Sequence, residues 1–146
     1  MADPQHRSPS PAFVGASWSA LFVGVATYLA GLCNAGMQLS EKGYYLVLLM
    51  YGLFAAVSLQ KSVRDRLDGI AVTSLYQGLC WGSLLVTLVL LSVGLWNAAL
   101  ANSEKGFYGM GFVLSLFAAV AVQKNVRDQT PEAESYQRQP GRVATD

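Results

Sequence analysis

The sequence predicts an all-α membrane protein whose four transmembrane helices form two tandem parallel two-helix hairpin repeats. Composition is the first reason: 53% of the residues are hydrophobic and 13% are charged, about half the charged share of a soluble domain. The spacing of the charges is the second, because it leaves four uncharged stretches long enough to cross a bilayer. The third is a repeat that occupies most of the chain.

The repeat runs from Trp18 to Asp65 and again from Trp81 to Asp128, without an insertion or deletion. At a constant offset of 63 positions, 22 of the 48 aligned residues are identical. The shared motifs are Gly-Leu-x-Asn-Ala, Ser-Glu-Lys-Gly-(Tyr/Phe)-Tyr, Leu-Phe-Ala-Ala-Val and Gln-Lys-x-Val-Arg-Asp. Self-similarity at a fixed period indicates that one structural unit is used twice.

The repeat divides the chain into five expected segments. They are a disordered cytoplasmic tail (1–16), a first two-helix repeat (17–68), a cytoplasmic linker (69–79), a second two-helix repeat (80–128) and a disordered cytoplasmic tail (129–146). Both tails are polar and contain proline, which is why we expect them to be disordered. The apolar run after the first tail is too long for a signal-peptide core, so we expect the first helix to be retained.

The four uncharged stretches predict four membrane-spanning helices. A helix rises about 1.5 Å per residue and the hydrocarbon core is roughly 30 Å thick, so about 20 apolar residues span it. The two shorter stretches, of 18 residues each, just span and lack the polar face of a surface helix. The expected helices run from Trp18 to Met37, Gly43 to Gln60, Leu79 to Ala101 and Gly106 to Val122.

A short polar motif joins the two helices of each repeat. Ser40 and Ser103 are expected to cap the second helix of each hairpin, because a serine oxygen can accept a hydrogen bond from a free amide in the first turn. Glu41 and Glu104 then lie in that turn, where the helix dipole favours them. Because little room is left for a loop, we expect a tight helical hairpin. An outer interfacial aromatic belt would consist of Tyr44, Tyr45, Trp96, Phe107 and Tyr108.

Two asparagines are candidate polar sites near these turns. Asn34 and Asn97 precede Glu41 and Glu104 by seven residues, which places each asparagine on the same helix face as its own glutamate, about two turns deeper. One interpretation is a pair of sites for an ion or a small solute. The favoured interpretation is that each amide forms a hydrogen bond across a helix interface and fixes its register.

The charged residues of the turns have two interpretations as well. Brought together by the repeat, they would form an ion-selective vestibule at the outer mouth. A cap and hairpin motif explains them more simply and is favoured. The residues are Glu41, Lys42, Glu104 and Lys105.

Basic residues mark the opposite end of both hairpins. They are expected either to bind anionic lipid head groups or simply to set the topology, and they are Lys61, Arg64, Lys124 and Arg127. Asp65 and Asp128 are each expected to pair with an arginine across the repeat. Gly69 is expected to end the second helix a turn or two beyond the membrane.

The distribution of Lys and Arg predicts the orientation. Eight lie in the tails and the middle loop, against two in the turns. Cytoplasmic segments retain an excess of these residues, so we expect both termini in the cytoplasm, which makes the repeats parallel.

The bilayer is the first expected partner. Small residues recur four positions apart and favour a compact four-helix bundle or a homo-oligomer, and another membrane protein is a further partner to consider. These pairs are Ala20 with Gly24, Gly31 with Ala35, Gly78 with Gly82, and Ser115 with Ala119. A net charge of +1 without a basic cluster argues against nucleic acid.

An enzyme is not expected. No Asp, Glu, Lys or Arg falls inside an expected span, and such residues usually mark proton relays and coupled transport. The only histidine, His6, lies in a tail without metal-ligand neighbours. No catalytic residue, metal site or cofactor is therefore predicted.

With its motifs in duplicate and in register from Trp18 to Asp128, the chain resembles the YiaA/YiaB family of bacterial inner membrane proteins, in its form with two copies of the two-helix domain. That resemblance implies a bacterial inner membrane location and a family without an assigned reaction. It supplies no catalytic residue.

The predicted function is therefore that of a non-enzymatic inner membrane protein with a structural, accessory or stress-related role. The alternative is a small channel or facilitator for an ion or small polar solute, with an outer mouth formed by Asn34, Glu41, Asn97 and Glu104.

Overall fold

The computed structural model describes residues 9–129, which form four α-helices. They are α1 (Pro11–Asn34), α2 (Leu39–Leu67), α3 (Ser74–Asn97) and α4 (Asn102–Gln129). All four are long and apolar enough to cross a membrane, so the predicted fold class is confirmed. The parts of the two expected tails at residues 1–8 and 130–146, including His6, lie outside the described residues.

The helix ends differ from the expected boundaries. α1 begins at Pro11, so residues 11–16 are helical and do not belong to a disordered tail. Ser10 caps this end by accepting a hydrogen bond from the N–H of Phe13 at 3.3 Å, and proline suits the first helical position. The expected start was set by counting the apolar residues needed to cross the hydrocarbon core. A helix with a capping residue can begin outside that core. The other helices also begin before their expected starts, whereas α1 and α3 end earlier than expected, at Asn34 and Asn97.

The connection between α2 and α3 is shorter than expected. It covers residues 68–73, because α3 already begins at Ser74. Gly69 adopts a positive φ of 75° directly after the helix end, a left-handed conformation that glycine adopts without a steric penalty. The predicted end of the second helix near Gly69 is therefore confirmed.

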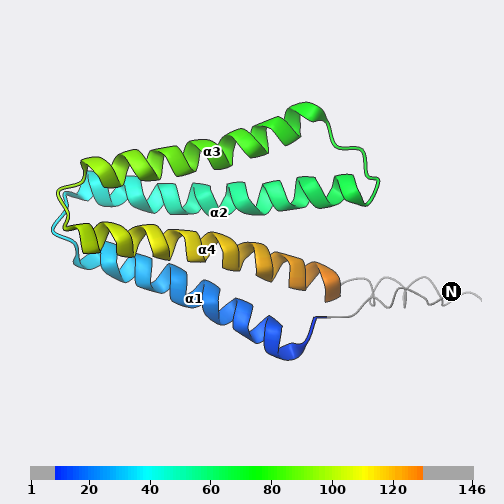
Figure 1. Ribbon diagram of the computed structural model, residues 1–146, viewed down its shortest axis with the longest axis horizontal. Coiled ribbons are helices and arrows are strands. Elements are labelled where there is room, and N and C mark those ends of the chain that lie inside the picture. The colour runs from blue at the N-terminus through cyan, green and yellow to red at the C-terminus, as the bar shows by residue number, and fades with distance from the viewer. Residues whose placement is uncertain (1–8, 130–146) are drawn as a thin grey trace, which may run out of the picture.

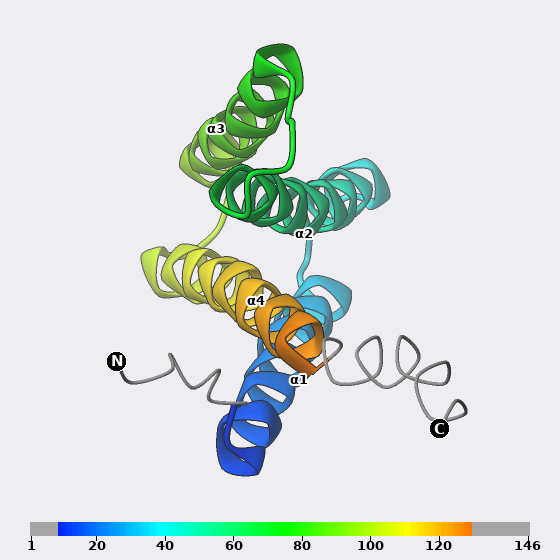
Figure 2. The same cartoon turned by 90° about the vertical axis from the view of Figure 1, so that its right-hand side faces the viewer.

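The four helices lie in the spatial order α3, α2, α4, α1 (Figures 1 and 2). The turns α1–α2 and α3–α4 lie at one end, here called the turn end. The α2–α3 connection and the described start and finish of the chain lie at the other, here called the basic end. α2 and α4 occupy the centre, and α1 and α3 lie on the outside.

Each helix packs mainly against a helix of the other repeat. The principal partner of α1 is α4, and that of α3 is α2, while α1–α2 and α3–α4 contacts are few. The prediction of tight hairpins is therefore wrong as a description of packing, although the turns are short. The helices also form a row and not the expected compact bundle, because α4 lies between α1 and α2 (Figure 1).

Two glycines explain the close cross-repeat contacts. A Cβ added to Gly24 of α1 would lie 2.8 Å from the Oγ of Ser115 on α4 and 3.1 Å from its backbone nitrogen. At the repeat-related contact the roles are exchanged, because Gly52 lies on α2 and a Cβ there would be 3.0 Å from the Cγ2 of Thr87 on α3. Each of the two contacts thus has one glycine. It comes from α1 in the α1–α4 contact and from α2 in the α2–α3 contact. Without a Cβ the backbones can approach closely.

An aromatic cluster fills the molecule toward the turn end. The rings of Tyr45 and Tyr108 are stacked across the two repeats, with centroids 6.2 Å apart and planes 19° apart. Tyr28 packs edge-on against Tyr108 at 5.6 Å. Tyr45 and Tyr108 are only 3% and 4% exposed. They are therefore core residues and not members of the expected belt, whereas Trp96 is 85% exposed.

The glycine of each Gly-Leu-x-Asn-Ala motif faces the aromatic pair of the other repeat. A Cβ on Gly31 would lie 2.9 Å from Cε1 of Phe107, and one on Gly94 would lie 2.8 Å from Cε1 of Tyr44. The two motifs therefore form a single contact that occurs twice. By contrast, a Cβ on Gly78 or Gly82 would meet open space within the described chain.

Candidate functional site

The glutamate of each turn caps the helix that follows it. A carboxylate oxygen of Glu41 accepts a hydrogen bond from the N–H of Gln38 at 2.9 Å. In the other repeat Glu104 accepts one from the N–H of Ala101, also at 2.9 Å. Free amides at helix starts need such partners, and the dipole favours a negative charge there.

Ser40 and Ser103 are not the caps that the sequence suggested. α2 begins at Leu39 with Gln38 as its N-cap, and α4 begins at Asn102. Both serines therefore lie inside the first turn. The prediction failed because each helix begins before its serine.

The lysine of each turn caps the C-terminal end of the preceding helix. Nζ of Lys42 donates to the carbonyl of Cys33 at 2.9 Å, and Nζ of Lys105 donates to the carbonyl of Trp96 at 3.2 Å. These carbonyls lie in the last turns of α1 and α3, where backbone acceptors lack amide partners and a positive charge is favourable. Each Glu-Lys pair thus joins the end of one helix to the start of the next.

The two asparagines make local hydrogen bonds. Nδ2 of Asn34 donates to the carbonyl of Ala30 at 2.7 Å, and Nδ2 of Asn97 donates to that of Val93 at 2.8 Å. Both acceptors belong to the same helix as the asparagine. The expected hydrogen bond across a helix interface is therefore wrong, because the nearby carbonyls of the helix terminus take the amide instead.

Each asparagine shares a pocket with the glutamate of the other repeat. One pocket, of about 320 Å³, is lined by Asn34, Glu104 and Tyr108 among others. The second, of about 300 Å³, includes Asn97 and Glu41. The expectation that each asparagine shares a helix face with its own glutamate is wrong, because the asparagine ends one helix and the glutamate lies in the next.

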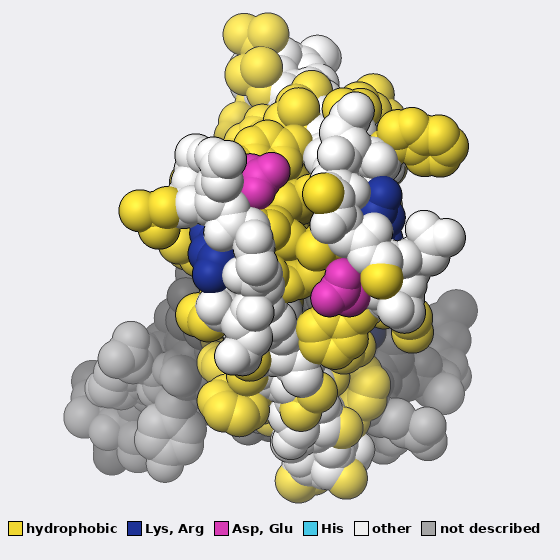
Figure 3. Space-filling model, turned by 90° about the vertical axis from the view of Figure 1, so that its left-hand side faces the viewer, with side chains coloured by type: hydrophobic (Ala, Val, Ile, Leu, Met, Phe, Trp, Pro, Cys, Tyr) yellow, Lys and Arg dark blue, Asp and Glu magenta, His cyan; other side chains and the backbone are white. Residues whose placement is uncertain are grey.

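The turn charges form two separate groups. Figure 3 shows the turn end, where acidic and basic side chains lie on both sides of a strip of hydrophobic side chains. A single vestibule that combines all four charges is not formed by the described chain. The core cluster beyond the pockets contains Tyr28, Tyr45, Tyr108 and Phe112.

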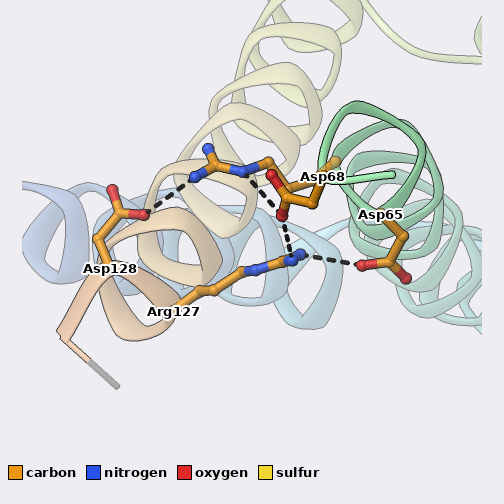
Figure 4. A network of polar contacts seen from close by, with 5 residues as sticks. Asp65, Asp68, Arg127 and Asp128 are labelled. Atoms are coloured by element: carbon orange, nitrogen blue, oxygen red, sulfur yellow. Dashed lines mark hydrogen bonds and ion pairs between the residues drawn. The ribbon is translucent and has the colours of Figure 1, made fainter. Parts of the chain in front are cut away.

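Ion pairs connect the repeats at the basic end (Figure 4). Arg127 of α4 contacts Asp65 at 3.2 Å and Asp68 at 2.7 Å. Arg64 of α2 lies 3.7 Å from Asp128 and 3.6 Å from Asp68. The pairing of each repeated aspartate with an arginine across the repeat, as the sequence suggested, is present.

Asp68 is a member of this network that sequence reasoning missed. It lies outside the repeated segment, so duplication gave no signal for it. Its position four residues after Arg64, at the end of α2, was the available signal, because residues at this spacing are neighbours on a helix surface.

Buried polar atoms surround the network. The Oε1 atoms of Gln60 and Gln123 are buried without a hydrogen-bond partner among the described residues, as are Ser62 Oγ and Asn125 Oδ1. Asn125 donates through Nδ2 to Ser17 Oγ at 3.1 Å. Gln60 and Gln123 also line a cavity of about 20 Å³, roughly the space that one water needs.

A larger groove runs from this end toward the middle of the molecule. It measures about 650 Å³ and is lined by α2, α3 and α4, mostly by apolar side chains, with Gln60 and Arg64 among its polar members. Among residues 9–129 there is no group of three His, Cys, Asp or Glu side chains placed to hold a metal ion.

These features define a four-span helical membrane protein built from a duplicated helix pair. The chain belongs to the YiaA/B two helix domain family, whose model matches it twice, at residues 13–65 and 76–128. Each match covers one pair of consecutive helices, which agrees with the predicted repeat and confirms the resemblance.

Two relatives in Escherichia coli (strain K12) are both described as inner membrane proteins. Inner membrane protein YiaA is 60% identical over 119 residues, which are 82% of this chain and 82% of the relative. Inner membrane protein YiaB is 31% identical over 96 residues, which are 65% of this chain and 80% of the relative. No solved structure shows a significant match to the chain.

Proposed function

We propose that the chain is a non-enzymatic component of the bacterial inner membrane with a structural, accessory or stress-related role. The observation that carries this proposal is that residues of three of the four duplicated motifs take part in helix packing, helix capping or ion pairs between the repeats. The glycines face aromatic rings, the Glu-Lys pairs cap helix ends, and the arginines and aspartates hold the repeats together. An accessory role further implies another membrane protein, or a second copy, as partner.

The proposed orientation places the basic end, with both termini, in the cytoplasm. The excess of Lys and Arg in the tails and in the last turns of α2 and α4 supports it. The two lysines at the turn end are engaged by carbonyl groups of helix termini, which gives them a structural reason to lie there.

The second candidate is a facilitator for an ion or small polar solute. The two pockets at the turn end favour it, because each combines an asparagine amide with a carboxylate. Against it stands the buried core cluster toward the turn end, which contains Tyr28, Tyr45, Tyr108 and Phe112.

Flux through reconstituted vesicles separates the two candidates. Purified protein in liposomes is compared with protein-free liposomes for the passage of K⁺, Na⁺ and glycerol. We expect no flux above the protein-free level. Flux that disappears in the doubly substituted variant Asn34→Leu/Asn97→Leu, while its helix content and unfolding temperature are kept, would overturn the proposal in favour of the facilitator.

A further inference from the structure

We propose that the 650 Å³ groove between α2, α3 and α4 binds one anionic phospholipid, with an acyl chain along the apolar wall and the phosphate at Arg64. The volume lies within the range of roughly 300–1,000 Å³ that is usual for small-molecule sites. Trp81, Leu84 and Leu88 of α3 form one side of the groove, and Val113 and Phe117 of α4 form the other.

The length of the groove matches one acyl chain. From Arg64, where the phosphate would lie, the lining on α2 extends inward to Ala56, which at 1.5 Å per residue is about 12 Å. The hydrocarbon core is roughly 30 Å thick, so one leaflet is about 15 Å deep. The part of the groove inward of Arg64 therefore lies within a single leaflet, the one at the basic end.

Arg64 is the cation available to a phosphate. Its two ion pairs, at 3.6 and 3.7 Å, are longer than hydrogen bonds, whereas Arg127 binds its two aspartates at 3.2 and 2.7 Å. Arg64 also lines both the groove and the small cleft beside it. Its guanidinium group therefore retains donors for a phosphate oxygen, which is a strong charge-assisted acceptor.

The charge around this end of the groove is positive. The cations of the cleft are Lys61, Arg64, Lys124 and Arg127, and the carboxylates of the network are Asp65, Asp68 and Asp128. The excess of cations favours an anionic head group over a neutral one.

Gln60 is the second polar side chain of the groove. Its Oε1 is buried without a donor among the described residues, and the side chain lines both the groove and the cleft. An unsatisfied buried acceptor is costly. Because Gln60 lies one turn deeper than Arg64, on the acyl-chain side of a phosphate there, the donor for this oxygen would be a water in the 20 Å³ cavity and not the lipid head group.

Lipid retention measured by native mass spectrometry tests the site. Full-length protein is delipidated in mild detergent and titrated with phosphatidylglycerol or with phosphatidylethanolamine. We expect one phosphatidylglycerol per chain, retained more strongly than phosphatidylethanolamine. The variant Arg64→Gln should lose about tenfold or more in affinity, the equivalent of one hydrogen bond to a charged group.

Matched controls lie beside each tested residue. Arg66→Gln removes a cation of the same helix that binds Gln77 and does not line the groove, so retention should persist. Leu84→Trp fills the groove and should prevent binding, whereas Leu85→Trp alters a neighbouring exposed residue and should not. Unfolding temperatures verify that each variant is folded.

Three outcomes overturn the proposal: equal retention of the two lipids, equal loss in Arg64→Gln and Arg66→Gln, or undiminished binding by folded Leu84→Trp. Retention is measured independently of flux, so this inference goes beyond the proposed function and can fail while that function stands.

Discussion

At the scale of single residues, the absence of a side chain decides where helices can meet. Gly24 lies directly against the backbone of Ser115, and Gly52 lies against Thr87 and Phe112. A larger residue on one side of each contact requires a glycine on the other. Sequence reasoning did single out Gly24 and Ser115 as small residues suited to packing, but it could not show that they meet each other.

Gly24→Ala should destabilise the protein by about 1–3 kcal/mol, the usual cost of overpacking. The added methyl group would meet backbone atoms of Ser115, which cannot rotate away. Unfolding in bicelles, followed by circular dichroism, measures the change. Gly15→Ala is the control in the same helix, because no atom lies within 4 Å of its added Cβ. The control should keep or raise stability, since alanine favours a helix by up to about 1 kcal/mol.

The capping residues provide a second test at this scale. Glu41→Ala should lower the free energy of unfolding by roughly 0.5–1 kcal/mol, because the N–H of Gln38 loses its acceptor. Glu104→Ala should act similarly at Ala101. Ser40→Ala, by comparison, should change stability little. A larger loss in Ser40→Ala than in Glu41→Ala would restore serine as the cap.

The sequence located these polar groups correctly but not their partners. A cap depends on the residue at which a helix begins, and hydrophobic composition sets that point only to within a few residues. The same uncertainty concealed the local hydrogen bonds of Asn34 and Asn97. The duplicated arginines and aspartates were easier to interpret, because opposite charges at one end of two helices have few other partners.

At the scale of helices, their number followed from composition, whereas their ends and their pairing did not. Four apolar stretches predict four spans, since the bilayer fixes the length that a helix needs. The same apolar residues could be buried in either of two arrangements. The two helices of a repeat could pack against each other, or each could pack against a helix of the other repeat. The choice depends on shape, such as Gly31 against Phe107 and Gly94 against Tyr44, and shape complementarity has no period in the sequence.

Disulfide crosslinking tests directly whether each helix packs against a helix of the other repeat. In a background without Cys33 and Cys80, which are both free thiols, the pair Gly24→Cys/Ser115→Cys should form a bond within one chain. The pair Gly52→Cys/Thr87→Cys should do the same. Contacts this close are compatible with the Cα separation of about 4.4–6.8 Å that a disulfide requires. Mobility on non-reducing gels after mild oxidation provides the measurement.

The same four positions supply the controls when they are recombined. Gly24→Cys/Gly52→Cys joins helices of the first repeat, and Thr87→Cys/Ser115→Cys joins helices of the second. Neither should crosslink, because the helices of one repeat make few contacts. Crosslinking of these pairs in preference to the cross-repeat pairs would show that the hairpins pack on themselves.

At the scale of the whole molecule, the order α3, α2, α4, α1 leaves the outer helices largely uncovered by protein (Figure 2). Phe22 of α1 is 75% exposed and Leu85 of α3 is 64% exposed. Such surfaces are stable in lipid, which is as apolar as the side chains themselves. Among the four described helices, only the central α2 and α4 have protein neighbours on both sides.

The proposed orientation predicts how the two ends react with a membrane-impermeant maleimide. In cells whose outer membrane is permeabilised, a cysteine at Lys42 or Lys105 should be labelled, because the turn end then faces the periplasm. A cysteine at Arg66 should be labelled only after the inner membrane is disrupted. Labelling of Arg66→Cys in intact spheroplasts, with Lys42→Cys protected, would reverse the assignment.

The exchange of helices has a consequence for biogenesis. The ribosome delivers α1 to the membrane first and α4 last, yet these two helices are each other's principal neighbours. α1 therefore remains in lipid without its principal neighbour until the 28-residue α4 has been inserted. A nascent chain stalled before that point remains an unfinished membrane domain, with the ring of Tyr45 still lacking the ring of Tyr108 on which it stacks.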